Sequence, residues 1–388
     1  MKVCIVGVGA RIAAVSKELK QAKPDFTFAA YVDPAPAAIH LVEEINGAPL
    51  TSYDDLAIML AEEKPDVLLI GSPNFLHLEH LKAARESDTP KIFCEKPVVI
   101  SEEETFQLLD LMQKHNGHER VMVGLVLRYS PLYVALREAQ ANGQLGEVVS
   151  IEASEHIGPY HGSFFMRDWR RFTSLSGGFM LEKCCHDLDL YQGLVGARPA
   201  KIASFGGRRI FRPENRPADF KGFPQPDTAR SIDPFSPRWN GGASEYNSDG
   251  DLIDHQTALI EYSNGSQLCF HTNMFVPDEF RRFAVIGTKG MAEGDFIRGF
   301  FKVHDAFSGS VVSEKETLDG EQAGHYGADQ AMARDLVAHL ERGEPLPVSV
   351  VEALEAGLTA LKLDQARNSG AVIDMTQTWD RFDAYLSN

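Results

Sequence analysis

The stretch Val3-Cys4-Ile5-Val6-Gly7-Val8-Gly9-Ala10-Arg11-Ile12 decides the fold. An apolar run of strand length passes into a glycine-rich turn, and a helical pattern follows the turn. The first glycine of such a turn permits a tight bend, and the second lets the backbone approach a pyrophosphate at the positive N-terminus of the helix. This stretch therefore predicts the opening strand–turn–helix of a dinucleotide-binding domain.

Asp33 follows the second apolar run, Ala29-Ala30-Tyr31-Val32. An acid in that place accepts hydrogen bonds from the adenosine ribose hydroxyls and repels a 2′-phosphate, so NAD is favoured over NADP. Arg11 is a cation at the turn that would soften this preference. Ile12 stands in the place of the third glycine, whose usual role is helix–strand packing rather than contact with phosphate.

Up to residue 126, apolar runs alternate with longer helical stretches. Strands that are nearly continuous apolar runs are typical of a parallel sheet covered on both faces. Residues 1–126 are therefore predicted to form an NAD-binding Rossmann domain with a doubly wound α/β sheet. The strands are expected at Val3–Val6, Phe28–Val32, Val67–Ile70, Ile92–Cys94 and Val121–Leu125.

The pattern changes after residue 126. Several strand-like runs between Lys201 and Val312 are separated by turn dipeptides, and two helical segments close the chain. Residues 127–388 are therefore predicted to form an α+β domain with a large, mostly antiparallel sheet, for substrate binding and oligomerisation. Further elements are expected as a helix over about Pro131–Asn142, a strand over Val148–Glu155, and helices over Phe179–Val195, Ala328–Glu341 and Val350–Asn368.

Residues 206–251 form a long insertion with six glycines, six prolines and several arginines. Loops of this length are uncommon in compact domains and tend to be lids, binding loops or disordered segments. A lid, an oligomer contact and a decorative insertion all remain open from the sequence.

Composition excludes several classes of protein. The 388 residues carry 38 Lys and Arg against 55 Asp and Glu, a net charge of −17, which argues against nucleic acid or an anionic membrane as partner. No apolar run is long enough to span a bilayer and no signal peptide is recognisable, so the cytoplasm is expected. The five cysteines have no C-x-x-C spacing and are expected to be buried free thiols.

Three further motifs carry a family resemblance. They are Gly71-Ser72-Pro73-Asn74-Phe75-Leu76-His77, then Glu95-Lys96-Pro97, and, after Gly177-Gly178, Glu182-Lys183-Cys184-Cys185-His186-Asp187-Leu188-Asp189. The chain resembles the Gfo/Idh/MocA family, the glucose–fructose oxidoreductase and inositol dehydrogenase group, over almost its full length. The resemblance implies an NAD-dependent oxidoreductase of sugars or polyols that forms a homo-oligomer, a dimer or a tetramer.

The resemblance also implies roles for residues near the cofactor. Lys96 reaches the substrate beside the nicotinamide, and a cis Lys96-Pro97 bond would aim it into the cleft between domains. Together with the glycine turn, the resemblance implies a cofactor site formed by Gly7, Gly9, Ala10, Arg11, Ile12, Asp33, Ser72, Pro73, Asn74, His77, Glu95, Lys96 and Arg128.

Glu182 and His186 stand where family members usually carry Asp, three residues, then His. On a helix, positions i and i+4 share a face, so the two side chains can bracket one sugar hydroxyl. On spacing alone, His186 is equally a core histidine bonded to Asp189, and a metal site is not expected. The implied substrate site comprises Lys96, Tyr129, His161, Trp169, Arg170, Lys183, His186, His255 and His325, with Lys96, His186 and Glu182 as the catalytic residues.

The expected reaction is hydride transfer between a sugar, polyol or glycoside carbon and NAD. His186 takes the hydroxyl proton, and the Lys96 ammonium stabilises the alkoxide. Some relatives are instead redox-neutral, NAD-dependent glycoside hydrolases, which oxidise C3 transiently and eliminate the glycoside. Glu182 and Lys183 offer acid–base groups for that route, which stays open. A non-catalytic sugar-sensing protein is the third alternative, although such relatives tend to lose the lysine or the histidine.

Overall fold

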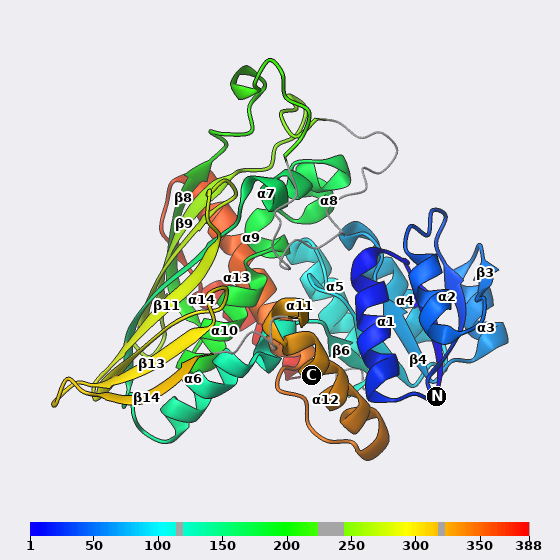
Figure 1. Ribbon diagram of the computed structural model, residues 1–388, viewed down its shortest axis with the longest axis horizontal. Coiled ribbons are helices and arrows are strands. Elements are labelled where there is room, and N and C mark those ends of the chain that lie inside the picture. Colours follow the sequence, from blue (N-terminus) through cyan, green and yellow to red (C-terminus); the bar gives the residue numbers. More distant parts are fainter. Residues whose placement is uncertain (114–118, 224–243, 317–322, 388) are drawn as a thin grey trace. The chain divides into compact units, whose positions relative to one another are not determined.

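The computed structural model describes residues 1–113, 119–223, 244–316 and 323–387 (Figure 1). Its contacts form two compact units. Unit 1 comprises Met1–Tyr129, Ala328–Gly357 and Arg381–Asn388, and unit 2 comprises Ser130–Gly327 and Leu358–Asp380. The expected boundary after residue 126 lies near the end of the first segment of unit 1, while two C-terminal segments also belong to that unit.

Unit 1 is built on a six-stranded parallel sheet in the order β3-β2-β1-β4-β5-β6. This order, with its reversal between β1 and β4, confirms the doubly wound dinucleotide-binding fold. The expected apolar runs form every strand except β3, a short polar strand with no apolar pattern to reveal it. The strands are β1 (Lys2–Val6), β2 (Thr27–Val32), β3 (Thr51–Tyr53), β4 (Val67–Ile70), β5 (Lys91–Cys94) and β6 (Val121–Val123).

Helices α1 to α5 alternate with these strands along the chain, and α12, from a later part of the chain, also belongs to unit 1. Helix α1 buries Ile12, Val15, Ser16 and Leu19, a spacing of three and four residues that places one face in the core, and it also packs against α12. The helices are α1 (Ala10–Ala22), α2 (Ile39–Asn46), α3 (Leu56–Glu63), α4 (His77–Glu86), α5 (Glu102–Gln113) and α12 (Ala328–Arg342).

Unit 2 is built on a nine-stranded sheet in the order β14-β13-β12-β11-β7-β10-β9-β8-β15 (Figure 1). Within this sheet, as far as its residues are described, only the β7–β10 pair is parallel, so the expected mostly antiparallel sheet is confirmed. The strands are β7 (Val148–His156), β8 (Pro199–Gly207), β9 (His255–Tyr262), β10 (Gln267–Asn273), β11 (Phe280–Gly287), β12 (Gly290–Asp295), β13 (Phe300–Asp305), β14 (Val311–Glu316) and β15 (Ile373–Asp374).

The two faces of this sheet differ. Alternate residues such as Ile151, Leu268 and Phe270 are buried on the face that carries α6 (Pro131–Ala141) and α10 (Cys185–Val195). The opposite face, here called the open face, exposes apolar side chains in the middle of strands, where alternation normally places polar residues. Within strands these residues are Phe205, Leu259 and Ile286, and exposed Val372 directly precedes β15.

The expected helical stretch from Phe179 to Val195 is divided into two helices. Helix α9 (Phe179–Glu182) ends before Lys183, and α10 begins at Cys185. Lys183 and Cys184 keep backbone angles near the helical region, but the ladder of hydrogen bonds is interrupted between the two helices. Glu182 and His186 therefore do not lie on one regular helix. The remaining helices are α7 (Pro159–Phe165), α8 (Thr173–Ser176), α11 (Ala323–Tyr326), α13 (Val350–Ser369) and α14 (Thr376–Leu386).

The structure also bears on the expectations for the cysteines, the long insertion and membrane-spanning helices. Cys269 is exposed on the open face, so the expectation that the cysteines are buried is wrong for it, while the other four are buried. Residues 224–243 of the long insertion lie outside the described residues, so its expected roles are not settled. In the part of the chain that is described, no helix is both long and apolar enough to cross a membrane.

Candidate active site

The glycine turn of unit 1 is shaped by close backbone contacts. Gly7 has φ +80°, and a Cβ there would lie 2.3 Å from the Ser72 backbone, so only glycine fits. A Cβ on Gly71 would lie 2.7 Å from Cβ of Ile12. Ile12 thus fills the place of the usual third glycine because Gly71, on the neighbouring strand end, leaves room for it.

The N-terminus of α1 fits a pyrophosphate. A Cβ on Gly9 would meet nothing within 4 Å, so open space lies beside the N-cap. No side chain caps this end, and no acidic residue occupies the first turn. The first backbone N–H groups of α1 therefore keep their positive potential for an anion.

Asp33 directly follows β2 and binds the backbone of the glycine turn after β1. Its Oδ2 accepts from the Val8 N–H at 2.6 Å, and its Oδ1 accepts from the Ala35 N–H at 2.7 Å. The carboxylate is therefore fixed beside the glycine turn, where each oxygen keeps a second lone pair for a ribose hydroxyl.

Arg11 binds two carboxylates of unit 1. Its Nε lies 2.9 Å from Oε1 of Glu95, and its Nη1 lies 2.7 Å from Oδ1 of Asp329 in α12. Burial opposes its charge, but the two carboxylates together raise the pKa of Arg11. Arg11 is therefore engaged within unit 1, and Glu95 is a buried partner of the residue that follows the glycine turn.

Two buried side chains, His77 and Glu95, hold the turn that carries Lys96. The Lys96-Pro97 peptide is cis, as the resemblance implied. His77, which is buried, places Nδ1 2.7 Å from the Pro97 carbonyl and Nε2 2.9 Å from the Ser72 carbonyl. Glu95 Oε2 accepts from the Lys96 N–H at 3.3 Å. His77 thereby ties the ends of β4 and β5 together, and burial lowers its pKa against the effect of these two carbonyls.

Other expected cofactor residues lie at the same end of the sheet. Ser72 and Asn74 are buried in the turn after β4, and Ser72 Oγ lies 2.9 Å from Nδ1 of His80. Arg128 is buried, and its guanidinium lies 3.4 Å from Glu352 Oε1 and 3.4 Å from the Pro347 carbonyl. Tyr129, expected at the substrate, is also buried.

The Gly177-Gly178 pair leads into the site of unit 2. Both residues have positive φ, +83° and +91°, which side chains rarely adopt. A Cβ on Gly178 would also lie 2.6 Å from Oδ2 of Asp364, which is in the same unit. The pair therefore turns the chain so that α9 begins against Asp364.

Glu182 forms a buried ion pair. Its Oε1 lies 2.9 Å from Nε of Arg170, and its side chain is only 6% exposed. The Arg170 guanidinium also lies over the rings of Phe164 and Trp169, at 4.0 and 4.2 Å from their centroids. Glu182, Arg170 and Trp169 are therefore brought together, and the charge of Glu182 is balanced inside unit 2.

Lys183 joins a buried network that the sequence does not predict. Its Nζ lies 3.0 Å from Glu155 Oε1, and Glu155 Oε2 lies 3.0 Å from Nε of Arg281. Arg281 also binds Asp187 in a bidentate manner, at 2.9 and 2.6 Å. Burial acts to raise the pKa of Glu155, but the charges of Arg281 and Lys183 outweigh burial, so the pKa is lowered. The one hint of this network in the sequence is Glu155, a charged residue at a strand position whose alternate neighbours, Ile151 and Ala153, face the core.

His161 lies beside this network. Its Nδ1 is 3.4 Å from Oε1 of Glu279, and the same oxygen accepts from the Gly158 N–H at 2.6 Å. Burial and the charge of Lys183 lower the pKa of His161, while Glu279 opposes that shift. Glu279, like Arg281, is a residue that sequence analysis missed.

His186 is buried at the start of α10, and its ring centroid lies 6.3 Å from that of His325. His325 and Tyr326 both have positive φ, +44° and +63°. Such a conformation costs a non-glycine residue roughly 1–2 kcal/mol. Two expected substrate residues, His186 and His325, are thus brought together within unit 2.

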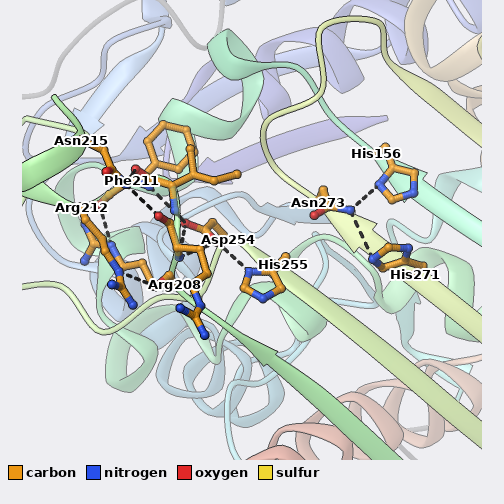
Figure 2. Close-up of polar contacts among 11 residues, drawn as sticks. His156, Arg208, Phe211, Arg212, Asn215, Asp254, His255, His271 and Asn273 are labelled. Carbon is orange, nitrogen blue, oxygen red and sulfur yellow. Dashed lines mark hydrogen bonds and ion pairs between the residues drawn. The ribbon is translucent and has the colours of Figure 1, made fainter. Parts of the chain in front are cut away.

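His255 lies in a different environment. Its Nδ1 is 2.9 Å from Oδ1 of Asp254, whose carboxylate also accepts the backbone N–H groups of Arg209, Ile210 and Phe211 (Figure 2). On the adjoining strands, His156 and His271 both approach the Asn273 side chain, at 3.1 and 3.3 Å (Figure 2). His255 and Asp254 therefore anchor the start of the long insertion beside a group of histidines on the open face.

Among the described residues, no group of three or more His, Cys, Asp or Glu side chains is placed to hold a metal ion.

The fold and the glycine turn define an NAD-binding Rossmann oxidoreductase, and comparison with known families agrees. The family model "Oxidoreductase family, NAD-binding Rossmann fold" matches residues 1–125, and "Oxidoreductase family, C-terminal alpha/beta domain" matches residues 137–375. The chain belongs to the Gfo/Idh/MocA oxidoreductase family.

Individual relatives are distant. The chain is 23% identical to the Bacillus subtilis protein named oxidoreductase YteT, over 76% of this chain and 77% of that protein. It is 25% identical to an inositol 2-dehydrogenase of Rhizobium meliloti, over 52% of this chain and only 56% of that protein. Among solved structures, a levoglucosan dehydrogenase in complex with NADH and levoglucosan has a TM-score of 0.77 at 17% identity, covering 96% of this chain and 99% of that one.

Proposed function

We propose that this protein is an NAD-dependent dehydrogenase that oxidises a hydroxyl-bearing carbon of a sugar, polyol or glycoside. The proposal rests on two side chains of this NAD-binding oxidoreductase, Lys96 and His186. Lys96 stands on a turn clamped by His77 and Glu95, and His186 is buried at the start of α10. NAD⁺ supplies a hydride acceptor when bound. The relatives named inositol 2-dehydrogenase and the levoglucosan dehydrogenase favour a cyclic polyol or a sugar as substrate.

His186 serves as the general base in this proposal. A hydride leaves a carbinol carbon only as the hydroxyl proton departs, and an imidazole has an ordinary pKa near neutrality. The Lys96 ammonium stabilises the negative charge that develops on the oxygen.

Glu182 acts through position rather than by proton transfer. Its Oε1 is bound by Arg170, and the pair is largely removed from water. One oxygen of the Glu182 carboxylate is thus already engaged by the Arg170 guanidinium. Its proposed role is to fix α9 and the chain that leads to His186.

The redox-neutral hydrolase route is less well supported. It needs acid–base groups besides His186, and the sequence offered Glu182 and Lys183. Glu182 is paired with Arg170, and Lys183 is paired with Glu155. Both candidates are therefore engaged in ion pairs, which favours the simple dehydrogenase.

NAD is the proposed cofactor in preference to NADP. Asp33 is fixed beside the glycine turn by two backbone N–H groups, and its charge would repel a 2′-phosphate. Arg11, the cation that would have softened this preference, is bound to Glu95 and Asp329.

We also propose that the chain forms a homo-oligomer through the open face of unit 2. Apolar patches rimmed by polar residues mark interaction sites. Phe205 is 67% exposed and Leu259 is 47% exposed, although both lie within strands of a large sheet.

The function is tested by following NADH in mixtures of the protein, NAD⁺ and a panel of cyclic polyols and sugars. NADH should form with at least one of them. Lys96→Met and His186→Asn should each lower the rate by 100-fold or more, since removing a general acid–base group costs about 10²–10⁴-fold. Rates within a few-fold of wild type for either variant would overturn the assignment.

A further inference from the structure

The arginine and the lysine of unit 2 that were expected at the substrate already have carboxylate partners. Arg170 is paired with Glu182 at 2.9 Å, and Lys183 is paired with Glu155 at 3.0 Å. The side chains of the two carboxylates are only 6% and 1% exposed, so water and salt screen neither pair strongly. Each cation is therefore neutralised by the chain itself before any substrate binds.

A third buried cation adds no surplus of positive charge to these pairs. Arg281 binds Asp187 through two nitrogen atoms, at 2.9 and 2.6 Å, and its Nε lies 3.0 Å from Glu155. Three cations thus face three carboxylates, and the six side chains together carry no net charge. This set, here called the paired-charge group, consists of Arg170, Lys183, Arg281, Glu182, Glu155 and Asp187.

The surroundings of Arg170 have the chemistry of a carboxylate-binding site. Its guanidinium lies 4.0 Å from the ring centroid of Phe164 and 4.2 Å from that of Trp169. Aromatic faces hold the planar guanidinium, and arginine is the side chain best suited to bind a carboxylate. The carboxylate that Arg170 binds is supplied by the chain itself, from Glu182. Burial lowers the pKa of Arg170 and the charge of Glu182 opposes that shift, so Arg170 would need another anion if Glu182 were removed.

We propose that Glu182 and Glu155 restrict the substrate to an uncharged sugar or polyol, because they occupy the cations that would otherwise bind a substrate carboxylate or phosphate. This inference rests on the proposed dehydrogenase function and names its substrate class. An anionic substrate would bring its charge to a group that is already neutral, and it would lose water without gaining a cationic partner. The Lys96 ammonium does not compensate for this loss, because in the proposed reaction it binds the oxygen of the reacting carbon. A substrate with only hydroxyl groups avoids the cost.

Matched substrates test the proposal by turnover. Each neutral sugar or polyol that the wild type oxidises is compared with its own uronic acid or phosphate ester, such as glucose with glucuronate and with glucose 6-phosphate. The anionic compound should have a kcat/KM at least 100-fold lower than its neutral counterpart.

Glu182→Gln keeps the size of the side chain and removes its charge, so the paired-charge group gains one net positive charge. The ratio of kcat/KM for the anionic substrate to that for the neutral one should rise at least ten-fold. This ratio cancels any loss of activity that affects both substrates. Asp249→Asn is the matched control, because Asp249 pairs with the neighbouring Arg171 at 2.8 Å but is 56% exposed. It should change the ratio by no more than two-fold.

A second readout needs no turnover and separates failure of this inference from failure of the proposed function. Glu182→Ala removes the partner of Arg170 and leaves room for a small carboxylate. Sodium acetate should therefore raise the melting temperature of Glu182→Ala by about 3 °C or more beyond sodium chloride at equal ionic strength, since a ligand that binds only the folded state stabilises it. Wild type and Asp249→Ala should show no such difference. Should Glu182→Ala not fold, the turnover ratio of Glu182→Gln decides the proposal.

The outcomes are distinct. If the wild type oxidises an anionic sugar as fast as its neutral counterpart, or Glu182→Gln leaves the ratio unchanged, the inference is wrong and the dehydrogenase stands. If no sugar or polyol is oxidised, the dehydrogenase falls. An unmoved melting temperature of Glu182→Ala in acetate then also overturns the assignment of Arg170 as a carboxylate site filled by Glu182.

Discussion

Nε of Arg170 lies 2.9 Å from Oε1 of Glu182, and the guanidinium also contacts the rings of Phe164 and Trp169. This ion pair joins a 3₁₀ turn at Asp168–Arg171 to the short helix α9 just before the candidate base His186. It gives Glu182 a structural partner that neither its spacing from His186 nor the family resemblance had indicated.

The pair predicts a large energetic coupling. Glu182→Ala should lower the free energy of unfolding by about 3 kcal/mol, because it leaves a mostly buried guanidinium without its partner. Arg170→Met combined with Glu182→Leu should cost much less, because neither charge remains buried. Urea denaturation of the two single variants and the double variant measures the coupling. A coupling below about 0.5 kcal/mol would match an exposed ion pair and contradict the buried one.

Cofactor preference should depend on Asp33. Asp33→Ser removes the carboxylate that repels a 2′-phosphate, so affinity for NADH should fall about ten-fold while affinity for NADPH rises, a change of about 1.4 kcal/mol for each factor of ten. Fluorescence titration with both nucleotides gives the ratio. Asp25→Ser, at a carboxylate 70% exposed and paired with Lys23, is the control and should leave the ratio unchanged. An unchanged ratio in Asp33→Ser would remove Asp33 from the cofactor site.

Stability should fall in acid partly through His156. Burial, and then the neighbouring His271, lowers the pKa of His156 to about 4. The unfolded chain takes up a proton near pH 6.5 and the folded chain does not, so this contribution is absent above pH 6.5 and destabilises the protein as the pH falls toward 4. The loss approaches about 3 kcal/mol. Denaturation midpoints of wild type, His156→Gln and His304→Gln between pH 7 and 4 measure it. Only His156→Gln should flatten the profile, and a profile as steep as that of wild type would contradict the shift.

Assembly should depend on the open face. Leu259→Asp places a charge in the middle of the exposed apolar residues and should reduce the mass measured by light scattering to that of one chain. Phe307→Asp is a suitable control because Phe307 is 85% exposed and lies in the turn between β13 and β14. A wild-type protein that is already a monomer at working concentration would end the proposal.

The fold of unit 1 was predictable because its deciding interactions are local. The run from Val3 to Ile12 carries the strand, the turn and the helix start together. Ile12 in the third glycine position weakened the motif, and its compensation by Gly71 depends on the pairing of β1 with β4, which no short stretch reveals. The polar edge strand β3 had no apolar signal.

The sequence motifs identified candidate site residues, but they did not reveal the ion-pair partners of these residues. Glu182, Lys183 and His186 are close in the sequence, yet the helix breaks between them with no glycine or proline to mark it. Their partners Arg170, Glu155 and Arg281 come from other elements of unit 2. Likewise, Arg11 meets Glu95 and Asp329 only through the tertiary fold. Motifs identify such residues, while their partners follow from packing.

Net hydride transfer from a sugar or polyol to NAD⁺ can be tested in a single assay. Free sugars, cyclic polyols and nitrophenyl glycosides are each incubated with the protein and NAD⁺, while NADH and nitrophenol are followed together. We expect NADH to form in proportion to product, and we expect the signal to be lost in Lys96→Met and His186→Asn. Nitrophenol released with only catalytic NAD⁺ and no net NADH would contradict it and establish the redox-neutral hydrolase instead.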